Sequence, residues 1–332
     1  MKVLNVGIAF VDLIAADLPS VAAPGELIYA PRGIKTRIGG HSVNVSIDLV
    51  KLGMKGDQIG IIAAVGEDVH GELIKRALQS YGVKHFLQKV KDVETSKDLV
   101  LVVQGEDRRF HVDIGASYRL SADFVKKTLK KLDFKILYIG GAGMLGEVDE
   151  KLEEILSYAK RRDKLIFIDI VAPYKKPWNH IIPSLKYADV FHVNLFEASM
   201  VTGKTKLEDA ARTLNDMGSK LALITLGEEG LYARTEDWSI KLGAFNVDVV
   251  DPTGAGDAFC AGVIHYLIRK EVERVKDLTV EECLDMLIYA SAVGASATTK
   301  EGTTEGVEIS FIKNLIREQE DKLRSKAEVE MH

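Results

Sequence analysis

Cysteine is scarce in this chain of 332 residues, which excludes a disulfide framework. The two cysteines, Cys260 and Cys283, lie in apolar patterns typical of helices. We therefore expect two buried free thiols, as in proteins of a reducing compartment. Long hydrophobic runs are lacking as well. No segment reaches membrane-spanning length, and the N-terminal segment has no long apolar region or cleavage site. We expect a cytoplasmic protein.

A strong excess of charge is also lacking. The formal net charge is -5, and no block of basic residues stands out. This balance gives no basis for a nucleic-acid or membrane partner. The hydrophobic fraction of 46% fits a globular protein with a substantial core, and the length suggests one large or two small domains.

Two classes of ligand site lack their motifs. No Gly-x-x-x-x-Gly-Lys-Ser/Thr sequence occurs, which excludes a P-loop enzyme, and the eight histidines show no zinc-site spacing. The segment from Gly141 to Gly146 resembles a dinucleotide-binding fingerprint, with Asp169 at the end of the next strand. However, Glu147 and Asp149 would place negative charge beside the phosphates. A nicotinamide-dependent dehydrogenase is therefore the weaker interpretation.

The most informative motif is Asp251-Pro-Thr-Gly-Ala-Gly-Asp257, followed by the apolar segment 258–268. The two glycines permit a tight turn, and the apolar segment predicts a buried helix. The N–H groups at the start of this helix can bind an anion such as phosphate. A carboxylate in such a site indicates a proton acceptor, although Asp257 could equally be a helix cap.

Two other segments are candidates for ligand contact. Asp12 follows the predicted strand 3–10, and an acid beyond a buried strand lies where α/β proteins bind ligands. Gly39 and Gly40 precede a predicted helix at 45–52, with Asn44 in its first turn. Paired glycines allow a ligand to approach the backbone. Turn formation by Asp12 and capping by Asn44 are the alternative structural roles.

Alternating strands and helices predict a parallel sheet covered by helices on both faces. Two half-polar regions interrupt this pattern, at 27–38 and at 95–113, the second with a turn at 105–107. They predict exposed hairpins that form a small antiparallel sheet. Further strands are expected at 59–65, 136–139, 165–170, 190–193 and 222–226, and helices at 71–81, 148–160, 206–217, 280–297 and 309–326.

Several motifs together resemble the PfkB (ribokinase-like) carbohydrate kinases. The segments 251–263 and 39–53 are similar to the C-terminal and N-terminal signatures of that family. Asn194-Leu-Phe-Glu197 is similar to its Asn-x-x-Glu element, and residues 225–230 and 290–303 to its nucleotide-binding segments. The resemblance covers nearly the whole chain. It implies a three-layer α/β/α domain (1–11, 39–94 and 118–332) with a small β lid (12–38 and 95–117).

The resemblance also implies roles for individual residues in an ATP-dependent sugar kinase. Asp257 would be the general base, and Gly254, Ala255 and Gly256 would form the anion hole. Asn194 and Glu197 would place Mg²⁺, through water. The implied sugar contacts are Asp12, Gly39, Gly40 and Asn44, and the implied ATP contacts are Asn194, Thr225, Gly227, Gly230, Ala290, Ala292 and Gly302. K⁺ binding by the loops at 251–253 and 295–302 is a further implication.

The substrate is not fixed by this resemblance. His41-Ser42 replaces the Lys-Gly of ribokinases, and glycines at 140–143 stand where ribokinases carry a Glu. The arginine that favours keto-acid sugars is missing after Asp169. A neutral sugar, a polyol or a nucleoside remains open. The alternatives to a sugar kinase are a kinase-like protein that binds without turnover and the dehydrogenase.

The predicted lid strands also suggest a partner. They have unpaired edges and carry the apolar residues Ile28, Ile34, Leu101 and Val103. Exposed edges are usually covered or paired, so we expect a homodimer through the lid.

Overall fold

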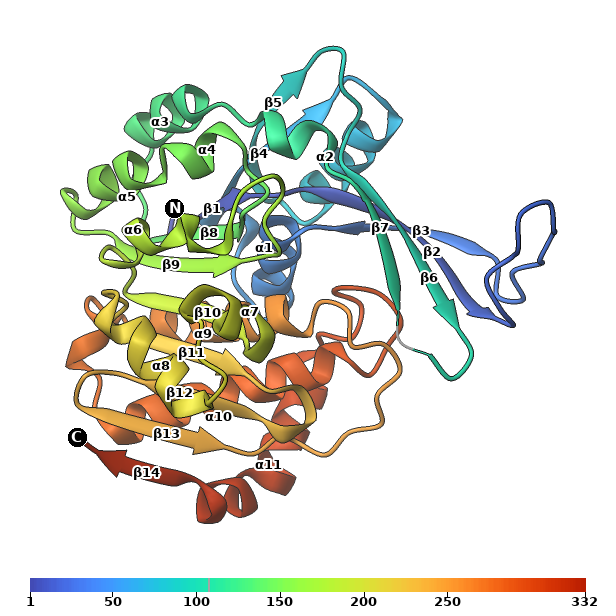
Figure 1. The fold of residues 1–332 in the computed structure, drawn as a ribbon. Helices are drawn as coiled ribbons and strands as arrows, with labels where there is room; N and C mark the ends of the chain where they lie inside the picture. Colours follow the sequence, from blue (N-terminus) through green and yellow to red (C-terminus); the bar gives the residue numbers. More distant parts are fainter. Residues whose placement is uncertain (107) are drawn as a thin grey trace.

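A ten-stranded sheet forms the centre of the molecule in the computed structural model, which describes residues 1–106 and 108–332 (Figure 1). The strand order is β14-β13-β12-β11-β10-β9-β8-β1-β4-β5. Pairing is parallel from β5 to β11 across the sheet and antiparallel from β11 to β14. The bounds are β1 Val3–Gly7, β4 Ile59–Gly66, β5 Lys84–Val90, β8 Ile136–Ala142, β9 Leu165–Ile170, β10 Val190–Asn194, β11 Leu221–Thr225, β12 Leu231–Arg234, β13 Trp238–Leu242 and β14 Glu328–Met331.

Helices cover both faces of this sheet, and each face has its own hydrophobic core. Successive strand residues point to opposite faces, so Ile61 of β4 belongs to one core and Ile62 to the other. One face is covered by α1 His41–Lys51, α2 Val69–Ser80, α9 Ala255–Arg269, α10 Val280–Ala297 and α11 Ile309–Lys326. The other is covered by α3 Ala122–Lys131, α4 Glu147–Glu150, α5 Leu152–Lys160, α6 Ile182–Leu185, α7 Leu195–Thr202 and α8 Leu207–Asp216. The predicted three-layer, mostly parallel α/β fold is confirmed.

A separate four-stranded sheet projects from this body (Figure 1). Its order is β3-β2-β6-β7, and we refer to it as the lid sheet. The bounds are β2 Phe10–Leu18, β3 Ile34–Gly39, β6 Lys97–Val103 and β7 Arg109–Asp113. Ala15, Leu18 and Val103 form a small core within it. The domain boundaries predicted from the sequence stay a prediction.

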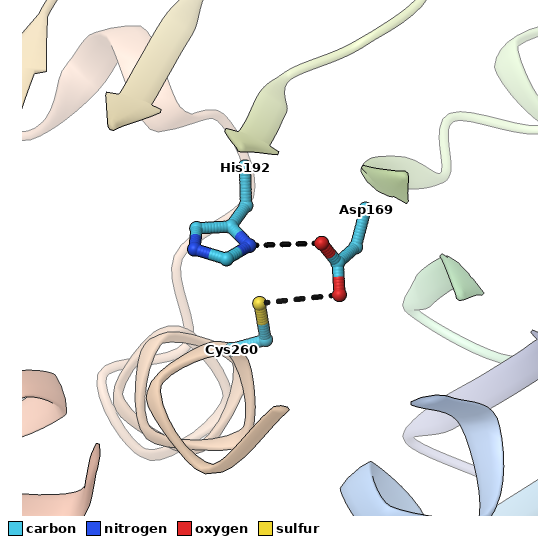
Figure 2. A group of neighbouring side chains, drawn as sticks. All are labelled: Asp169, His192 and Cys260. Atoms are coloured by element: carbon cyan, nitrogen blue, oxygen red, sulfur yellow. Dashed lines mark hydrogen bonds and ion pairs between the residues drawn. The ribbon is translucent and has the colours of Figure 1, made fainter. Parts of the chain in front are cut away.

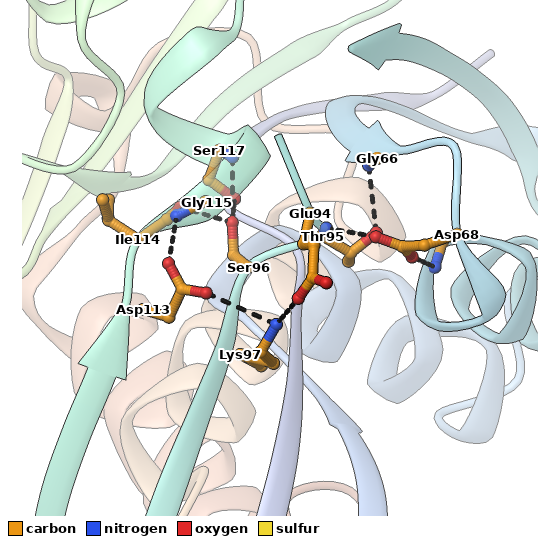
Figure 3. A network of polar contacts seen from close by, with 11 residues as sticks. Gly66, Asp68, Glu94, Thr95, Ser96, Lys97, Asp113, Ile114, Gly115 and Ser117 are labelled. Atoms are coloured by element: carbon orange, nitrogen blue, oxygen red, sulfur yellow. Dashed lines mark hydrogen bonds and ion pairs between the residues drawn. The ribbon is translucent and has the colours of Figure 1, made fainter. Parts of the chain in front are cut away.

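The lid sheet is attached to the body by a buried polar network (Figure 3). Ser96, just before β6, donates through Oγ to Ile114 O at 2.6 Å, and its Oγ lies 2.8 Å from Ser117 Oγ. Thr95 donates its N–H to Asp68 Oδ2 at 2.6 Å, and Asp68 also caps α2 through the N–H of Gly71. Because Thr95 and Ser96 are fully buried, this network fixes where β6 leaves the body.

Several predicted elements were wrong in their limits. The predicted strand 3–10 is two strands, β1 and β2, and the second enters the lid sheet. The predicted hairpin at 27–38 contains one strand, β3, whose partner is β2. The lid sheet is mixed and not antiparallel, since β2 and β6 run parallel. The helix predicted at 45–52 begins at His41, and the helix predicted at 148–160 is divided at Lys151.

The predicted turn at 105–107 includes Asp107, which lies outside the described residues. Within the described ranges, no helix is long and apolar enough to cross a membrane. Both cysteines are buried free thiols, as predicted.

Candidate active site

Asp257 lies in the first turn of α9, which begins after Gly254. Gly254 has a φ of 80°, and a Cβ at this position would overlap Thr303 O, so the turn requires glycine. Asn44 of α1 donates through Nδ2 to Asp257 Oδ2 at 2.8 Å. The other oxygen, Oδ1, is buried and has no hydrogen-bond partner among the described residues. Asp257 is thus anchored by an amide from α1 and does not act as a simple helix cap.

Burial raises the pKa of Asp257, and the nearby Asp169 carboxylate adds to this effect. His41 and the hydrogen bond from Asn44 act in the opposite direction. Ligand atoms of His41, Asp169 and Asp257 all lie within 4.8 Å of one another. The side chain therefore lies in a charged, largely buried environment in which a carboxyl group can hold a proton at higher pH than in water.

A second polar cluster, which includes Asp169, lies next to this region (Figure 2). His192 of β10 contacts Asp169 of β9 through Nδ1 at 2.8 Å, and the Cys260 thiol lies 3.8 Å from the other Asp169 oxygen. Burial disfavours the imidazolium, but Asp169 outweighs this effect and the pKa of His192 is raised. For Asp169, burial is outweighed by His192, so its pKa is lowered. The cluster is a buried ion pair next to the candidate base.

The backbone amides at the start of α9 differ in their hydrogen bonding. Gly256 and Asp257 donate their N–H groups to no acceptor in the part of the chain that the structure describes, whereas Ala255 makes a long bond of 3.3 Å to Pro252 O. An unsatisfied helix N-terminus favours an anion. Ala255 is therefore less available than Gly256.

Arg108, which lies just before β7, reaches this loop. Its Nη1 donates to Thr253 Oγ1 at 2.5 Å and lies 3.7 Å from Asp251 Oδ1. Asp251 also accepts the N–H of Gly302 at 3.0 Å, which joins the loop before α9 to the loop after α10. Arg108 was not among the site residues predicted from the sequence. The only available signal was its position in the predicted turn region, and the contact spans 145 residues.

The predicted sugar contacts come together at the junction of the two sheets. Asp12 lies within β2, and not beyond the end of a strand as expected, and it is buried. A Cβ at Gly39 would overlap the Asp12 carboxylate, so Gly39 leaves room for that side chain. Gly40 has a φ of 93° and precedes α1, which carries Asn44 in its first turn.

The predicted nucleotide contacts have different environments. Thr225 ends β11, and its hydroxyl lies 3.2 Å from Nε2 of His192. Gly227 has a φ of 62° and open space beside it, whereas a Cβ at Gly230 would overlap Leu242 O. Ala290 and Ala292 are fully buried in α10. A nucleotide contact for these two alanines stays a prediction without exposed surface to support it.

The predicted metal-binding residues, Asn194 and Glu197, form a capping box at the start of α7. Glu197 N donates to Asn194 Oδ1, and Asn194 N donates to Glu197 Oε2, both at 2.9 Å. Burial raises the pKa of Glu197. One carboxylate oxygen of Glu197 is not used by the box.

The glycine motif at 141–146 does not form a dinucleotide site. Asp149 accepts the N–H groups of Gly143 at 3.0 Å and of Leu145 at 2.8 Å, and it also pairs with Lys176 at 2.8 Å. The loop amides that a pyrophosphate would need already have a carboxylate acceptor. The resemblance to the fingerprint is therefore limited to its glycine spacing.

The comparisons with known proteins agree with this geometry. The chain is 26% identical over 302 residues to a fructokinase of Solanum tuberosum, covering 89% of this chain and 90% of the relative. It is also 26% identical over 301 residues to an ATP-dependent 6-phosphofructokinase of Thermoanaerobacterium thermosaccharolyticum, covering 87% and 86%.

Solved structures give the same fold. The ribokinase of Giardia lamblia superposes with a TM-score of 0.83 at 18% identity, covering 96% of this chain and 99% of its own. A putative ribokinase II of E. coli, in complex with ATP and Mg²⁺, superposes with a TM-score of 0.78 at 22% identity and the same coverage. The family described as pfkB family carbohydrate kinase matches residues 1–310. This chain therefore belongs to the pfkB family of carbohydrate kinases.

Proposed function

We propose that this protein transfers the γ-phosphoryl group of ATP to a hydroxyl group of a small carbohydrate. The observation that carries the proposal is the state of Asp257 at the N-terminus of α9. One of its oxygens is held by Asn44 and the other is buried without a partner among the described residues. A carboxylate with a purely structural role would accept hydrogen bonds through both oxygens, whereas a general base needs one oxygen free to accept a proton.

Asp257 acts as the general base in this mechanism. The acceptor hydroxyl lies against Oδ1, and its oxygen attacks the γ-phosphorus as the bond to the β–γ bridging oxygen breaks. The hydroxyl proton passes to Oδ1, and ADP leaves with the bridging oxygen. Asn44 fixes the orientation of the carboxylate throughout, since its amide holds Oδ2.

Charge on the transferred phosphoryl group is stabilised from two sides. The N–H groups of Gly256 and Asp257 point out of α9, and Arg108, just before β7, contacts Thr253 in the same loop. Gly254 sets the turn that presents the amides. Preorganised donors of this kind contribute most where charge develops in the transition state.

The residues present also fit a magnesium ion. Glu197 keeps one oxygen outside the capping box, and hard oxygen ligands, often with water, are what Mg²⁺ prefers. The ion would neutralise charge on the phosphates. Glu197 and Asn194 would hold its water ligands, while Thr225, Gly227, Gly230 and Gly302 would border the nucleotide and the loop carbonyls near Asp251 would suit K⁺.

The exposed surface of the lid sheet supports a homodimer. Ile34 is 67% exposed and Leu99 is 39% exposed. Ile34 pairs with Ala15 and Leu99 pairs with Leu13, two residues apart on β2, so both side chains lie on the same face of the lid sheet. The face predicted from the sequence included Val103, which is buried within the lid sheet. A second copy that covers Ile34 and Leu99 would remove this apolar surface from water.

The proposal is tested by incubating the purified protein with Mg²⁺, ATP and a panel of sugars, polyols and nucleosides. A phosphorylated product detected by ³¹P NMR, dependent on both acceptor and Mg²⁺, is the expected result. Stabilisation by MgATP with no product from any acceptor would favour the alternative, a kinase-like protein that binds without turnover. Stabilisation by NAD alone would contradict the kinase proposal.

A further inference from the structure

A second carboxyl group, which the proposed mechanism does not use, lies beside Asp12. Asp12 of β2 and Asp98 of β6 are register partners on adjacent parallel strands, so their side chains point to the same face of the lid sheet. Asp12 is 6% exposed and Asp98 is half-buried. Asp98 Oδ1 is buried with no hydrogen-bond partner among the described residues.

Protonation of the two carboxyl groups is linked, so the pair can hold one proton between them. Burial and then the neighbouring Asp98 raise the pKa of Asp12 well above its usual range. Burial raises the pKa of Asp98 to about 6, although its hydrogen bond with Asp12 works in the opposite direction. Two carboxyl groups this close do not both ionise easily, because each charge disfavours the other.

The surroundings of this pair carry more negative than positive charge. Asp257 of α9 and Glu305 of the loop after α10 both act on Asp12. On the neighbouring strand β3, Arg37 is the register partner of Asp12 and lies 3.4 Å from Glu305. Lys35 lies on the same face of β3 and pairs with Glu301 at 2.7 Å. Lys97 of β6 points to the opposite face, where it lies 3.4 Å from Asp113. Val112 of β7, the partner of Asp98, is uncharged.

We propose that Asp98 acts with Asp12 as a specificity determinant, which admits an uncharged, hydroxylated acceptor and excludes one that already carries a phosphate or a carboxylate. This inference rests on the proposed kinase function. Sequence similarity does not determine whether the acceptor is phosphorylated, because the chain is 26% identical both to a fructokinase and to a 6-phosphofructokinase. The proposed role of Asp98 predicts an unphosphorylated acceptor.

The physical basis is a difference in charge. A phosphorylated sugar would bring about two negative charges next to Asp98, Asp12 and Asp257, at a site where Arg37 already pairs with Glu305. A neutral sugar can instead donate hydrogen bonds from its hydroxyl groups to the two carboxylates. These hydrogen bonds take the place of the shared proton, which is released to solvent on binding.

The first test compares each acceptor with its own monophosphate. D-ribose, D-fructose, D-sorbitol and inosine are assayed beside their monophosphates with wild type, Asp98→Asn and the control Asp113→Asn. The control removes the same charge from the opposite face of the same sheet. We expect kcat/KM for the preferred unphosphorylated acceptor to exceed that for its monophosphate by about 100-fold or more in wild type and in Asp113→Asn. In Asp98→Asn this ratio should fall by about 10-fold, mainly through KM.

A wild-type preference for a monophosphate, or an unchanged ratio in Asp98→Asn, would overturn the role of Asp98 and leave the kinase proposal intact. A lack of turnover with every acceptor would overturn both.

The second test measures pH dependence in the absence of ATP. Sugar binding favours the ionised pair, so the Kd of the preferred sugar should decrease as pH rises from 5 to 8 in wild type, with proton release detected by calorimetry in buffers of different ionisation enthalpy. The Asp98→Asn variant should show a clearly weaker pH dependence. A wild-type Kd that does not change over this range, with no proton released, would contradict the shared proton.

Discussion

At the scale of single residues, the site is defined by which polar atoms already have partners. Asp257 and Asp169 are close neighbours with different roles. Asp169 is occupied on both oxygens, by His192 on one side and by Tyr138 and Cys260 on the other. Asp257 has one oxygen occupied. This difference in hydrogen bonding distinguishes Asp257, the proposed base, from Asp169, which belongs to the neighbouring buried ion pair.

The His192–Asp169 pair gives a prediction for stability. The pKa of His192 in the folded protein is raised above the usual histidine value of 6.5, mainly by the Asp169 carboxylate, which outweighs the effect of burial. The stabilisation that comes from its charge is therefore fully present below pH 6.5 and is lost as pH rises through the higher folded value. His192→Gln keeps a hydrogen-bond donor and removes the charge. Urea unfolding should show a loss of about 1–3 kcal/mol at pH 6 that shrinks toward pH 9.

The control for this experiment is His85→Gln, on the edge strand β5, which should cost little at any pH. A loss for His192→Gln that stays constant from pH 6 to 9 would show that packing, and not the ion pair, explains the effect.

Individual site residues could be predicted where their geometry is local. Gly254 and Asp257 were recognisable because a glycine turn followed by an apolar helix exposes N–H groups whatever surrounds it. The hydrogen bond from Asn44 to Asp257 spans 213 residues, and nothing in the local sequence indicates it. Asp98 was missed for the same reason, because its meaning depends on the register between β2 and β6.

At the scale of elements, α9 is positioned by unusually close packing against α10. A Cβ at Gly262 would lie 2.7 Å from Cα of Ala290, so the two helices approach nearly to backbone contact. This packing explains why Ala290 is buried. It also fixes the N-terminus of α9, where Asp257 lies.

Gly262→Ala tests this packing. An alanine in a helix is normally more stable than a glycine by about 0.5–1 kcal/mol. Here we expect a loss of about 1–3 kcal/mol in the free energy of unfolding, because the added methyl group separates α9 from α10. Gly243→Ala is the matched control, since its Cβ would meet its nearest neighbour at 3.8 Å. Equal or greater stability of Gly262→Ala would disprove the close packing.

The turn between β6 and β7 brings Arg108 to the loop before α9. Arg108→Ala should lower kcat/KM for ATP by about 100-fold without loss of the fold, because a charged donor to the phosphoryl group is removed. Arg109→Ala is the control, since Arg109 makes a surface ion pair with Glu106. Steady-state kinetics with circular dichroism distinguishes the two variants. Similar activity of both would remove Arg108 from the proposed mechanism.

Elements were predictable where hydrophobic periodicity is strong. The buried strands β4, β9 and β10 and the helices α10 and α11 follow directly from their apolar patterns. Strand β2 was not separated from β1, because both are apolar and only two residues lie between them. Strand β14 was missed because its four residues are all exposed, and it joins the sheet by pairing with β13.

At the scale of the whole molecule, the lid sheet has an exposed apolar face that a monomer would leave in water. We expect light scattering at micromolar concentration to give twice the chain mass of 36.5 kDa. Ile34→Glu combined with Leu99→Glu should produce a monomer, because two charges would be buried at the interface. Leu73→Glu, at a comparably exposed position on α2, should leave the mass unchanged. A monomeric wild type would contradict this proposal.

The layered body could be predicted as a whole, since repeated β-α units allow few arrangements other than a parallel sheet between helices. The lid sheet was predicted only as an exposed addition. Its strand order depends on β2, which was not predicted as a separate strand, and on parallel pairing between residues 86 positions apart, such as Asp12 and Asp98. Non-local pairing of this kind leaves no local signal.

The central claim is that Asp257 is the general base, and Asp257→Asn tests it most directly. Asparagine keeps the shape of the side chain and removes proton acceptance at Oδ1. With a phosphorylated acceptor identified, kcat should fall by about 10²–10⁴-fold while MgATP binding stays the same or becomes tighter. A folded Asp257→Asn protein that binds MgATP and retains kcat within about threefold of wild type would contradict the account, since removal of a general base is expected to cost far more.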